Sequence, residues 1–279
     1  MNRTILLFML LFLAVLKIDA QYFTSFRNPT DNYKVLDSAY LKCTYKLTFI
    51  KDTLFKDRIS TDIQTLQIGK GVSKYFSQYL LDYSVKMQEL ILKGAKSLPN
   101  STERGSCSFE VFKNYPKGKC TIADFGSGRT GKNIYEEMFS DLKWEIGVEY
   151  DTIFSYRCQK AVTKFRGRSY EAWFTTEIPI GDGPWKLGGL PGLILKVSDV
   201  QHYYNFECIG LETLKKKEPI KLYQLDYSHL ERKDLYKLYT RYGNDPVGFS
   251  KSMGVLEIIM VNGKESTNFK YPYNPIELN

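Results

Sequence analysis

Residues 39–50 read AYLKCTYKLTFI, and this stretch decides the fold class. Apolar side chains occupy every second position from Ala39 to Phe49, and Lys and Thr side chains fill the positions from Lys42 to Thr48 between them. Successive side chains of a β-strand point to opposite faces, so this alternation is typical of an antiparallel strand with one face in a core. The segment predicts a half-buried strand.

Most of the remaining chain follows the same pattern. Runs rich in β-branched and aromatic residues, separated by Gly, Pro, Asp and Arg, predict further strands. They cover residues 62–68, 144–150, 153–164, 168–178, 193–198 and 202–211. Helical spacing appears only at 82–96 and at 229–242, where Ser228 is a suitable N-cap. We predict an α+β, β-rich fold: a curved antiparallel sheet, half-barrel-like, with one or two helices.

The N-terminus has the features of an export signal. Arg3 precedes an unbroken apolar run from Ile5 to Leu16, and the small residue Ala20 follows shortly after. This run is shorter than the roughly 20 residues that span a bilayer, so it predicts a signal peptide at 1–20 rather than an uncleaved anchor. The 279-residue chain is 43% hydrophobic and 25% charged, which excludes disordered, collagen-like and polytopic membrane proteins. We predict one domain over 21–279, exported to the periplasm or cell envelope or secreted.

The net charge of +8 is spread along the chain. Only Lys215–Lys217 forms a basic run, and a solvated loop is favoured there over a binding patch. Because export removes the usual access to nucleic acid, we expect no nucleic-acid partner.

Five cysteines follow the predicted signal peptide, and an exported protein tends to pair them. Cys107 and Cys120 lie in one Gly- and Ser-rich stretch, so we expect a local disulfide within a Cys-containing insertion at about 98–133. This insertion is interpreted as a long loop or an inserted hairpin. Cys158 and Cys208 lie in strand-like runs and are candidates for a second disulfide. Cys43 is then left over, although sequence alone does not fix the connectivity.

A Gly- and Pro-rich segment interrupts the strands after residue 181. The glycines tolerate positive φ and the prolines fix φ, while Trp185 and Leu190 can anchor the turn on the core. We favour a buried connection over a loop that presents N–H groups to a ligand. Nearby, Arg166 and Arg168 favour an exposed hairpin turn over an anion clamp. The candidate residues, structural or ligand-facing, are Gly183, Pro184, Trp185, Gly189, Leu190, Pro191, Gly192, Leu193, Ile194, Trp173 and Arg168.

These motifs together resemble the GLPGLI family of exported bacterial proteins. Similar blocks occur in the same order at Tyr156–Ala161, Ala172–Thr175, Gly183–Trp185, Leu190–Leu193 and Asn274–Glu277. The resemblance covers roughly residues 35–279. It implies a Gram-negative envelope protein of undefined activity, so it supplies no catalytic residues.

Several sequences resemble catalytic or ligand-binding motifs but lack a required residue or spacing. Gly126–Lys132 has the spacing of a phosphate-binding loop, but Asn133 follows where Ser or Thr should bind Mg²⁺. Asp124-Phe125-Gly126 lacks the companion motifs of a kinase. Glu171 and Glu177 would lie about 20 Å apart along a strand, too far for glycoside hydrolysis. His202 and His229 form no metal-binding motif, so we expect no metal and no cofactor.

Three functions therefore remain as hypotheses. The first is an exported non-enzymatic envelope protein that binds or carries a hydrophobic ligand or contacts an outer-membrane partner. The second is a secreted or periplasmic hydrolase, peptidase-like, using either Cys158, for which His202 is the candidate base, or an unrecognised carboxylate. The third is a structural surface component.

Overall fold

The computed structural model describes residues 32–95, 108–126, 130–139, 142–254, 257–261 and 264–279. The predicted signal peptide at 1–20 and Cys107 lie outside these residues. Among the described residues, no helix combines the length and apolarity that crossing a membrane requires.

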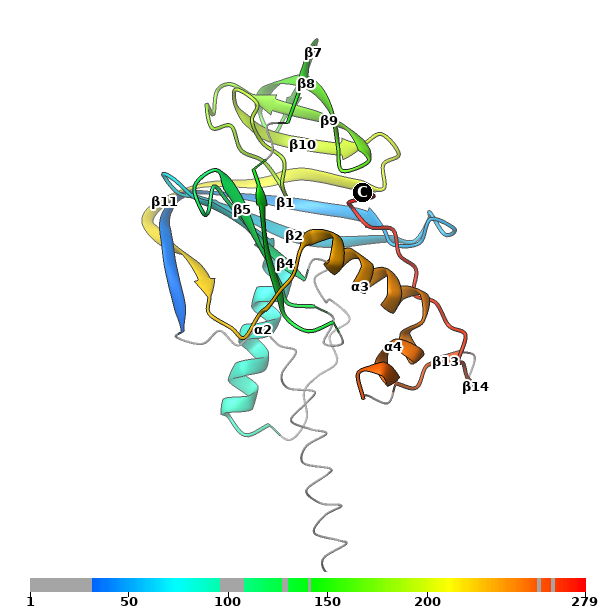
Figure 1. Ribbon diagram of the computed structural model, residues 1–279. Helices are drawn as coiled ribbons and strands as arrows, with labels where there is room; N and C mark the ends of the chain where they lie inside the picture. The colour runs from blue at the N-terminus through cyan, green and yellow to red at the C-terminus, as the bar shows by residue number, and fades with distance from the viewer. Residues whose placement is uncertain (1–31, 96–107, 127–129, 140–141, 255–256, 262–263) are drawn as a thin grey trace, which may run out of the picture.

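One curved sheet of twelve strands organises the described part of the chain (Figure 1). Its order is β12-β6-β5-β4-β3-β2-β1-β11-β10-β9-β8-β7, and every pairing is antiparallel except that of β12 with β6. The predicted β-rich, antiparallel α+β fold is confirmed. The strands are β1 (Tyr33–Ile50), β2 (Ile59–Ile68), β3 (Ser73–Ser77), β4 (Phe109–Lys113), β5 (Lys119–Asp124), β6 (Asn133–Met138), β7 (Glu145–Ile153), β8 (Tyr156–Phe165), β9 (Arg168–Thr175), β10 (Leu193–Asp199), β11 (Tyr204–Tyr223) and β12 (Ser228–His229). A separate small hairpin joins β13 (Met260–Val261) to β14 (Lys264–Glu265).

Strand β1 carries the centre of the core. Its alternate residues from Ala39 to Phe49 are buried, as the sequence pattern predicts. Its two edges pair with β2 and β11, so its backbone groups are satisfied on both sides. The hydroxyl of Tyr45 is fully buried and donates a 2.6 Å hydrogen bond to the carbonyl of Ile194. The second half of β1 is thereby linked to β10 through the core.

Three helices flank the sheet in the described residues: α2 (Gln78–Leu92), α3 (Arg232–Asn244) and α4 (Pro246–Ser252). Ser77 caps α2 by accepting a hydrogen bond from the backbone N–H of Leu80. The predicted start of the second helix is wrong. Ser228 belongs to β12, whose backbone pairs with β6, and α3 begins only at Arg232.

Two further local predictions also need correction. Lys215–Lys217 are solvated, as predicted, but they lie in β11 rather than in a loop, because β11 continues along the first part of β1. Cys120, Cys158 and Cys208 are free thiols, so the expected disulfides are contradicted. For Cys158 and Cys208 the reason is the strand order, which places β11 beside β1 and not beside β8. Cys208 consequently faces Cys43, with 3.4 Å between the two Sγ atoms.

Candidate functional site: a tyrosine-lined pocket

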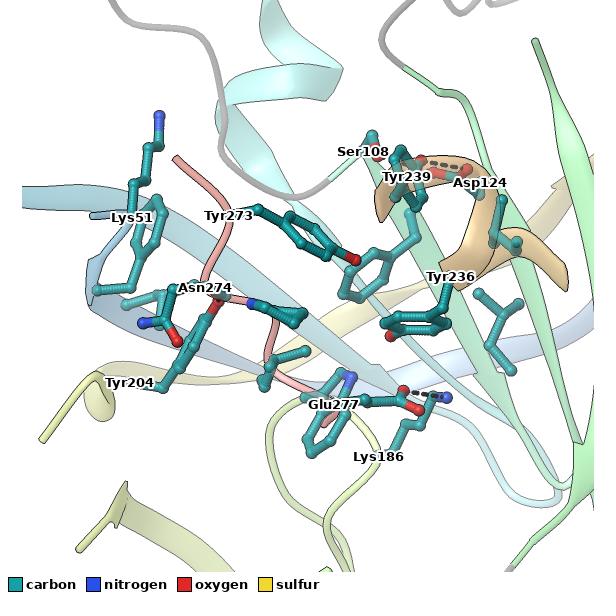
Figure 2. A pocket seen from close by; sticks show the side chains of 18 of the residues that line it. Lys51, Ser108, Asp124, Lys186, Tyr204, Tyr236, Tyr239, Tyr273, Asn274 and Glu277 are labelled. Atoms are coloured by element: carbon teal, nitrogen blue, oxygen red, sulfur yellow. Dashed lines mark hydrogen bonds and ion pairs between the residues drawn. The ribbon is translucent and has the colours of Figure 1, made fainter. Parts of the chain in front are cut away.

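Helix α3 and the C-terminal segment 272–277 close a pocket of about 250 Å³ against one face of the sheet (Figure 2). The sheet contributes side chains from β1, β3, β4, β5, β6 and β11. The segment between β9 and β10 adds Trp185 and Lys186. The pocket therefore depends on residues that are far apart in the sequence and are brought together by the sheet.

Six tyrosines line the pocket, Tyr75 and Tyr135 from the sheet among them. Tyr204 comes from β11, Tyr236 and Tyr239 from α3, and Tyr273 from the C-terminal segment, and Figure 2 shows them arranged around the cavity. Aromatic side chains offer flat apolar faces together with a polar edge. Such a surface suits a ligand that is itself both apolar and polar.

Asp124 provides a carboxyl group at one end of the pocket. It is 1% exposed and accepts hydrogen bonds from the hydroxyls of Tyr239 at 2.5 Å and Ser108 at 2.7 Å. Burial raises the pKa of Asp124, and the hydrogen bonds from Tyr239 and Ser108 oppose that rise only in part. The uncharged acid is thus favoured more strongly here than in water.

Lys186 and Glu277 occupy the opposite side of the pocket (Figure 2). Lys186 Nζ lies 2.6 Å from carboxylate oxygens of both Glu137 and Glu277, and Arg232 adds a second cation to Glu277 at 3.0 Å. Burial alone lowers the pKa of Lys186, but Tyr135, Glu277 and Glu137 outweigh it and the pKa rises. Lys186 is therefore a buried cation whose charge is compensated inside the protein.

The predicted Gly-Pro segment positions Trp185. A bridge joins Asp182 to Gly188, and the buried ammonium of Lys113 donates to Asp182 Oδ1 and to the carbonyls of Gly183 and Leu187. Trp185 and Leu190 are both buried, as expected of anchors. A Cβ on Gly192 would lie 2.0 Å from the carbonyl oxygen of Thr175, which explains the glycine. Pro184, Gly189, Pro191, Leu193 and Ile194 complete this segment and the start of β10.

Arg168 fastens the C-terminal wall of the pocket. Its guanidinium pairs with Asp199 at 3.0 Å and donates to Asn274 Oδ1 and to the carbonyls of Pro275 and Ile276. The prediction of an exposed hairpin arginine is therefore wrong for Arg168, which is 5% exposed. Arg166 is also partly covered and pairs with Glu137 at 2.7 Å. Both arginines are engaged by carboxylates of the protein itself.

The other candidates from the sequence lie away from the pocket. Trp173 is half-buried next to Lys160 and does not line the cavity. Burial raises the pKa of Cys158 to about 11, which disfavours the thiolate that a cysteine nucleophile requires. Among the described residues, no cluster of three or more His, Cys, Asp or Glu side chains is arranged to hold a metal ion.

Sequence reasoning missed the residues that give the pocket its polarity. Asp124 was considered only as part of a kinase-like triplet, and Glu277 only as part of a terminal motif. The available signal was weak: four consecutive apolar or small residues precede Asp124, so a carboxyl at the end of a buried strand was foreseeable. Nothing in the sequence indicates that α3 and the C-terminal segment face that strand.

The described residues thus form a curved antiparallel sheet that carries an aromatic, partly polar pocket. The family model that matches the sequence is the N-terminal domain of an N-glycanase peptide family, over residues 108–235. Two crystal forms of PNGF-II, in space groups P21 and C2, show similarity at a TM-score of 0.43 and 15% identity. Each match covers 71% of this chain but only 33% or 32% of the PNGF-II chain. This chain therefore spans about a third of the length of PNGF-II. No curated protein matches the sequence.

These findings correct two expectations. The resemblance to the GLPGLI family is wrong, because the matching model describes an N-glycanase domain instead. The expectation of a non-enzymatic envelope protein is contradicted by the same match, since N-glycanases are enzymes. The match is compatible with an exported protein.

Proposed function

We propose that this chain acts on N-linked glycoproteins outside the cytoplasm and holds one sugar unit of the glycan in the tyrosine-lined pocket. The observation that carries the proposal is the position of the family match. Ten of the 22 residues that line the pocket lie within 108–235, Asp124 and Trp185 among them. The N-glycanase likeness and the cavity thus overlap in part, and the other twelve lining residues lie outside the matched range.

The pocket also offers groups for acid–base chemistry. Asp124 is a carboxyl group whose uncharged form is favoured by burial, while Glu277 is a carboxylate paired with Lys186 and Arg232. Hydrolysis of a glycan linkage needs a proton donor for the leaving group, and a buried acid is suited to that role. We assign Asp124 as the candidate donor, with Tyr239 and Ser108 orienting its carboxyl.

The test is to incubate the full chain with an N-glycosylated protein and to follow glycan release by mass spectrometry. We expect release by the native chain and a loss of about 10²- to 10⁴-fold in Asp124→Asn, the usual contribution of a general acid. Asp151→Asn changes an exposed carboxylate on β7 and serves as the matched control, with activity unchanged. If the native chain binds the glycan without releasing it, the role assigned to Asp124 is wrong. If the native chain neither binds nor releases the glycan, the whole proposal is wrong.

A further inference from the structure

Cys43 of β1 and Cys208 of β11 bring two thiols into contact inside the core. Their Sγ atoms are 3.4 Å apart, and the side chains are 0% and 3% exposed. Among the described residues, this is the only pair of cysteines whose sulfur atoms lie within hydrogen-bonding distance. Cys158 is equally buried, but its sulfur lies 3.6 Å from the carbonyl oxygen of Tyr156. The fold therefore brings together one pair of thiols from positions 165 residues apart.

The pair lies at an irregularity between the two strands. Thr44 is opposite Gly210 and Tyr45 is opposite Cys208, so Ile209 is an extra residue in β11. An extra residue of this kind interrupts the ladder of backbone hydrogen bonds and bends the strand. A covalent link at this position would hold β1 and β11 together where their backbone pairing is interrupted.

The geometry of the two side chains suits bond formation. An S–S bond is about 2.05 Å long, so the two sulfur atoms have to approach each other by about 1.4 Å in total. A hydrogen bond from Cys43 lowers the pKa of Cys208, although burial opposes this effect. The thiolate is the form of cysteine that attacks a disulfide. Contact between the two thiols thus favours the reactive form of one of them.

We propose that Cys43 and Cys208 are the site of a disulfide bond that joins β1 to β11. This pair is neither of the two pairs that the sequence suggested, because it includes the cysteine that was left over. The same two strands carry Leu47 and Phe206 into the pocket, so the bond fixes two strands of the pocket wall relative to each other. The inference does not depend on the proposed action on glycoproteins.

The oxidant is itself a disulfide, that of a thiol–disulfide oxidoreductase or of oxidised glutathione. One cysteine thiolate attacks a sulfur atom of the oxidant, which breaks the S–S bond of the oxidant and releases its other sulfur as a thiolate. The second cysteine then attacks the protein sulfur of this mixed disulfide and releases the remaining sulfur of the oxidant. Two electrons and the two thiol protons pass to the oxidant. The predicted export signal directs the chain to a compartment that holds such oxidants, and the reaction takes place during folding, before the pair is buried.

The first experiment locates the bond by mass spectrometry. The full chain is refolded in a mixture of reduced and oxidised glutathione, then denatured without reductant in iodoacetamide, which alkylates every free thiol. After digestion we expect two peptides joined through Cys43 and Cys208, about 2 Da lighter than their sum, with Cys120 and Cys158 alkylated. Alkylation of both Cys43 and Cys208, or a bond from either to a different cysteine, overturns the proposal.

The second experiment measures what the bond does for stability. We expect dithiothreitol to lower the urea midpoint of the native chain by about 1 M, a shift typical of losing a cross-link that closes a long loop. Dithiothreitol should leave the midpoint of Cys43→Ala unchanged. Cys158→Ala also removes a buried thiol but lies outside the pair, so it is the matched control and should keep the full shift.

Two outcomes separate the bond from a general effect of the reductant. If dithiothreitol lowers the midpoint of Cys43→Ala as much as that of the native chain, the proposal is wrong. If Cys43→Ala does not fold, the joined peptides still decide the question. Failure of the native chain to bind or release a glycan overturns the proposed function and leaves this inference in place.

Discussion

Arg168 and Trp185 are both buried, but Arg168 lies behind the C-terminal wall of the pocket while Trp185 lines the pocket, and they differ in how their polar groups are satisfied. Arg168 makes four hydrogen bonds, to Asp199, Asn274, Pro275 and Ile276. The indole N–H of Trp185 makes none among the described residues. A fully paired group contributes to holding the fold, whereas a buried donor left unpaired is a cost to stability. The comparison separates a buried residue that stabilises the fold from one whose donor is left unpaired.

The largest loss of stability is expected when Arg168, the fully hydrogen-bonded residue, is replaced. Arg168→Met leaves Asp199 buried without its cation and frees the C-terminal segment from the sheet. Removing one partner of a buried pair costs about 3–5 kcal/mol, so the free energy of unfolding should fall by that amount in urea denaturation. Arg157→Met, at an exposed position beside Tyr150, is the control and should cost less than about 1 kcal/mol. Similar losses in the two variants would show that Arg168 is not a structural fastener.

A smaller loss should follow from disturbing the loop that carries Trp185. In Gly192→Ala the new Cβ meets the carbonyl oxygen of Thr175 at 2.0 Å, which forces the backbone to shift. Overpacking of this kind costs about 1–3 kcal/mol, measurable as a lower midpoint of thermal unfolding. In Gly189→Ala the added methyl group has open space but the φ of +85° is strained, so about 1 kcal/mol is expected. Equal losses would mean that close packing does not position the loop.

Much of the secondary structure was predictable, because the pattern that forms a strand is local in the sequence. In β1 the alternation of apolar and polar side chains follows directly from a strand with one buried face, and each predicted buried position from Ala39 to Phe49 is buried. The second half of β11 was missed, because Lys215–Lys217 and Pro219 hide any alternation in a part of the strand that is mostly exposed. A strand without a buried face leaves little pattern in the sequence.

The pocket was far less predictable. The burial of Trp185 and Leu190 followed from the Gly-Pro pattern, but the same pattern suggested the wrong family. A glycine such as Gly192 is required by the approach of Thr175, and this geometric need does not identify a function. Asp124 and Glu277 are brought to one cavity by the strand order and by the path of the C-terminal segment. Long-range placement of this kind is absent from any local pattern.

The pH dependence of stability tests Asp124, the buried carboxyl group of the pocket. Because the folded-state pKa of Asp124 is raised, the native chain binds a proton more readily than the unfolded chain does. The stabilising effect is complete below the unfolded pKa of about 3.9 and is lost as the pH rises through the folded-state pKa. Each unit of increase in the folded pKa corresponds to about 1.4 kcal/mol at high pH.

Asp124→Asn removes this dependence, since the amide does not ionise. The free energy of unfolding of the native chain should therefore decline relative to that of Asp124→Asn as the pH rises above about 4. Urea denaturation across pH 3–8 measures the difference between the two. A native chain that gains stability relative to the variant over this range would mean that Asp124 is held as a carboxylate.

The smallest effect is expected at Trp144, the bonded counterpart of Trp185. Trp144→Phe removes the hydrogen bond to the carbonyl of Gly188 on the loop that presents Trp185. A net loss of about 0.5–1.5 kcal/mol is expected beyond the loss of packing. Trp173→Phe removes the same atoms from another half-buried tryptophan, whose indole forms no hydrogen bond to the described residues, and so measures the packing part. If both variants lose equal stability in urea, the bonded indole contributes nothing through its N–H. The missing hydrogen bond of the Trp185 indole would then make no difference to stability either.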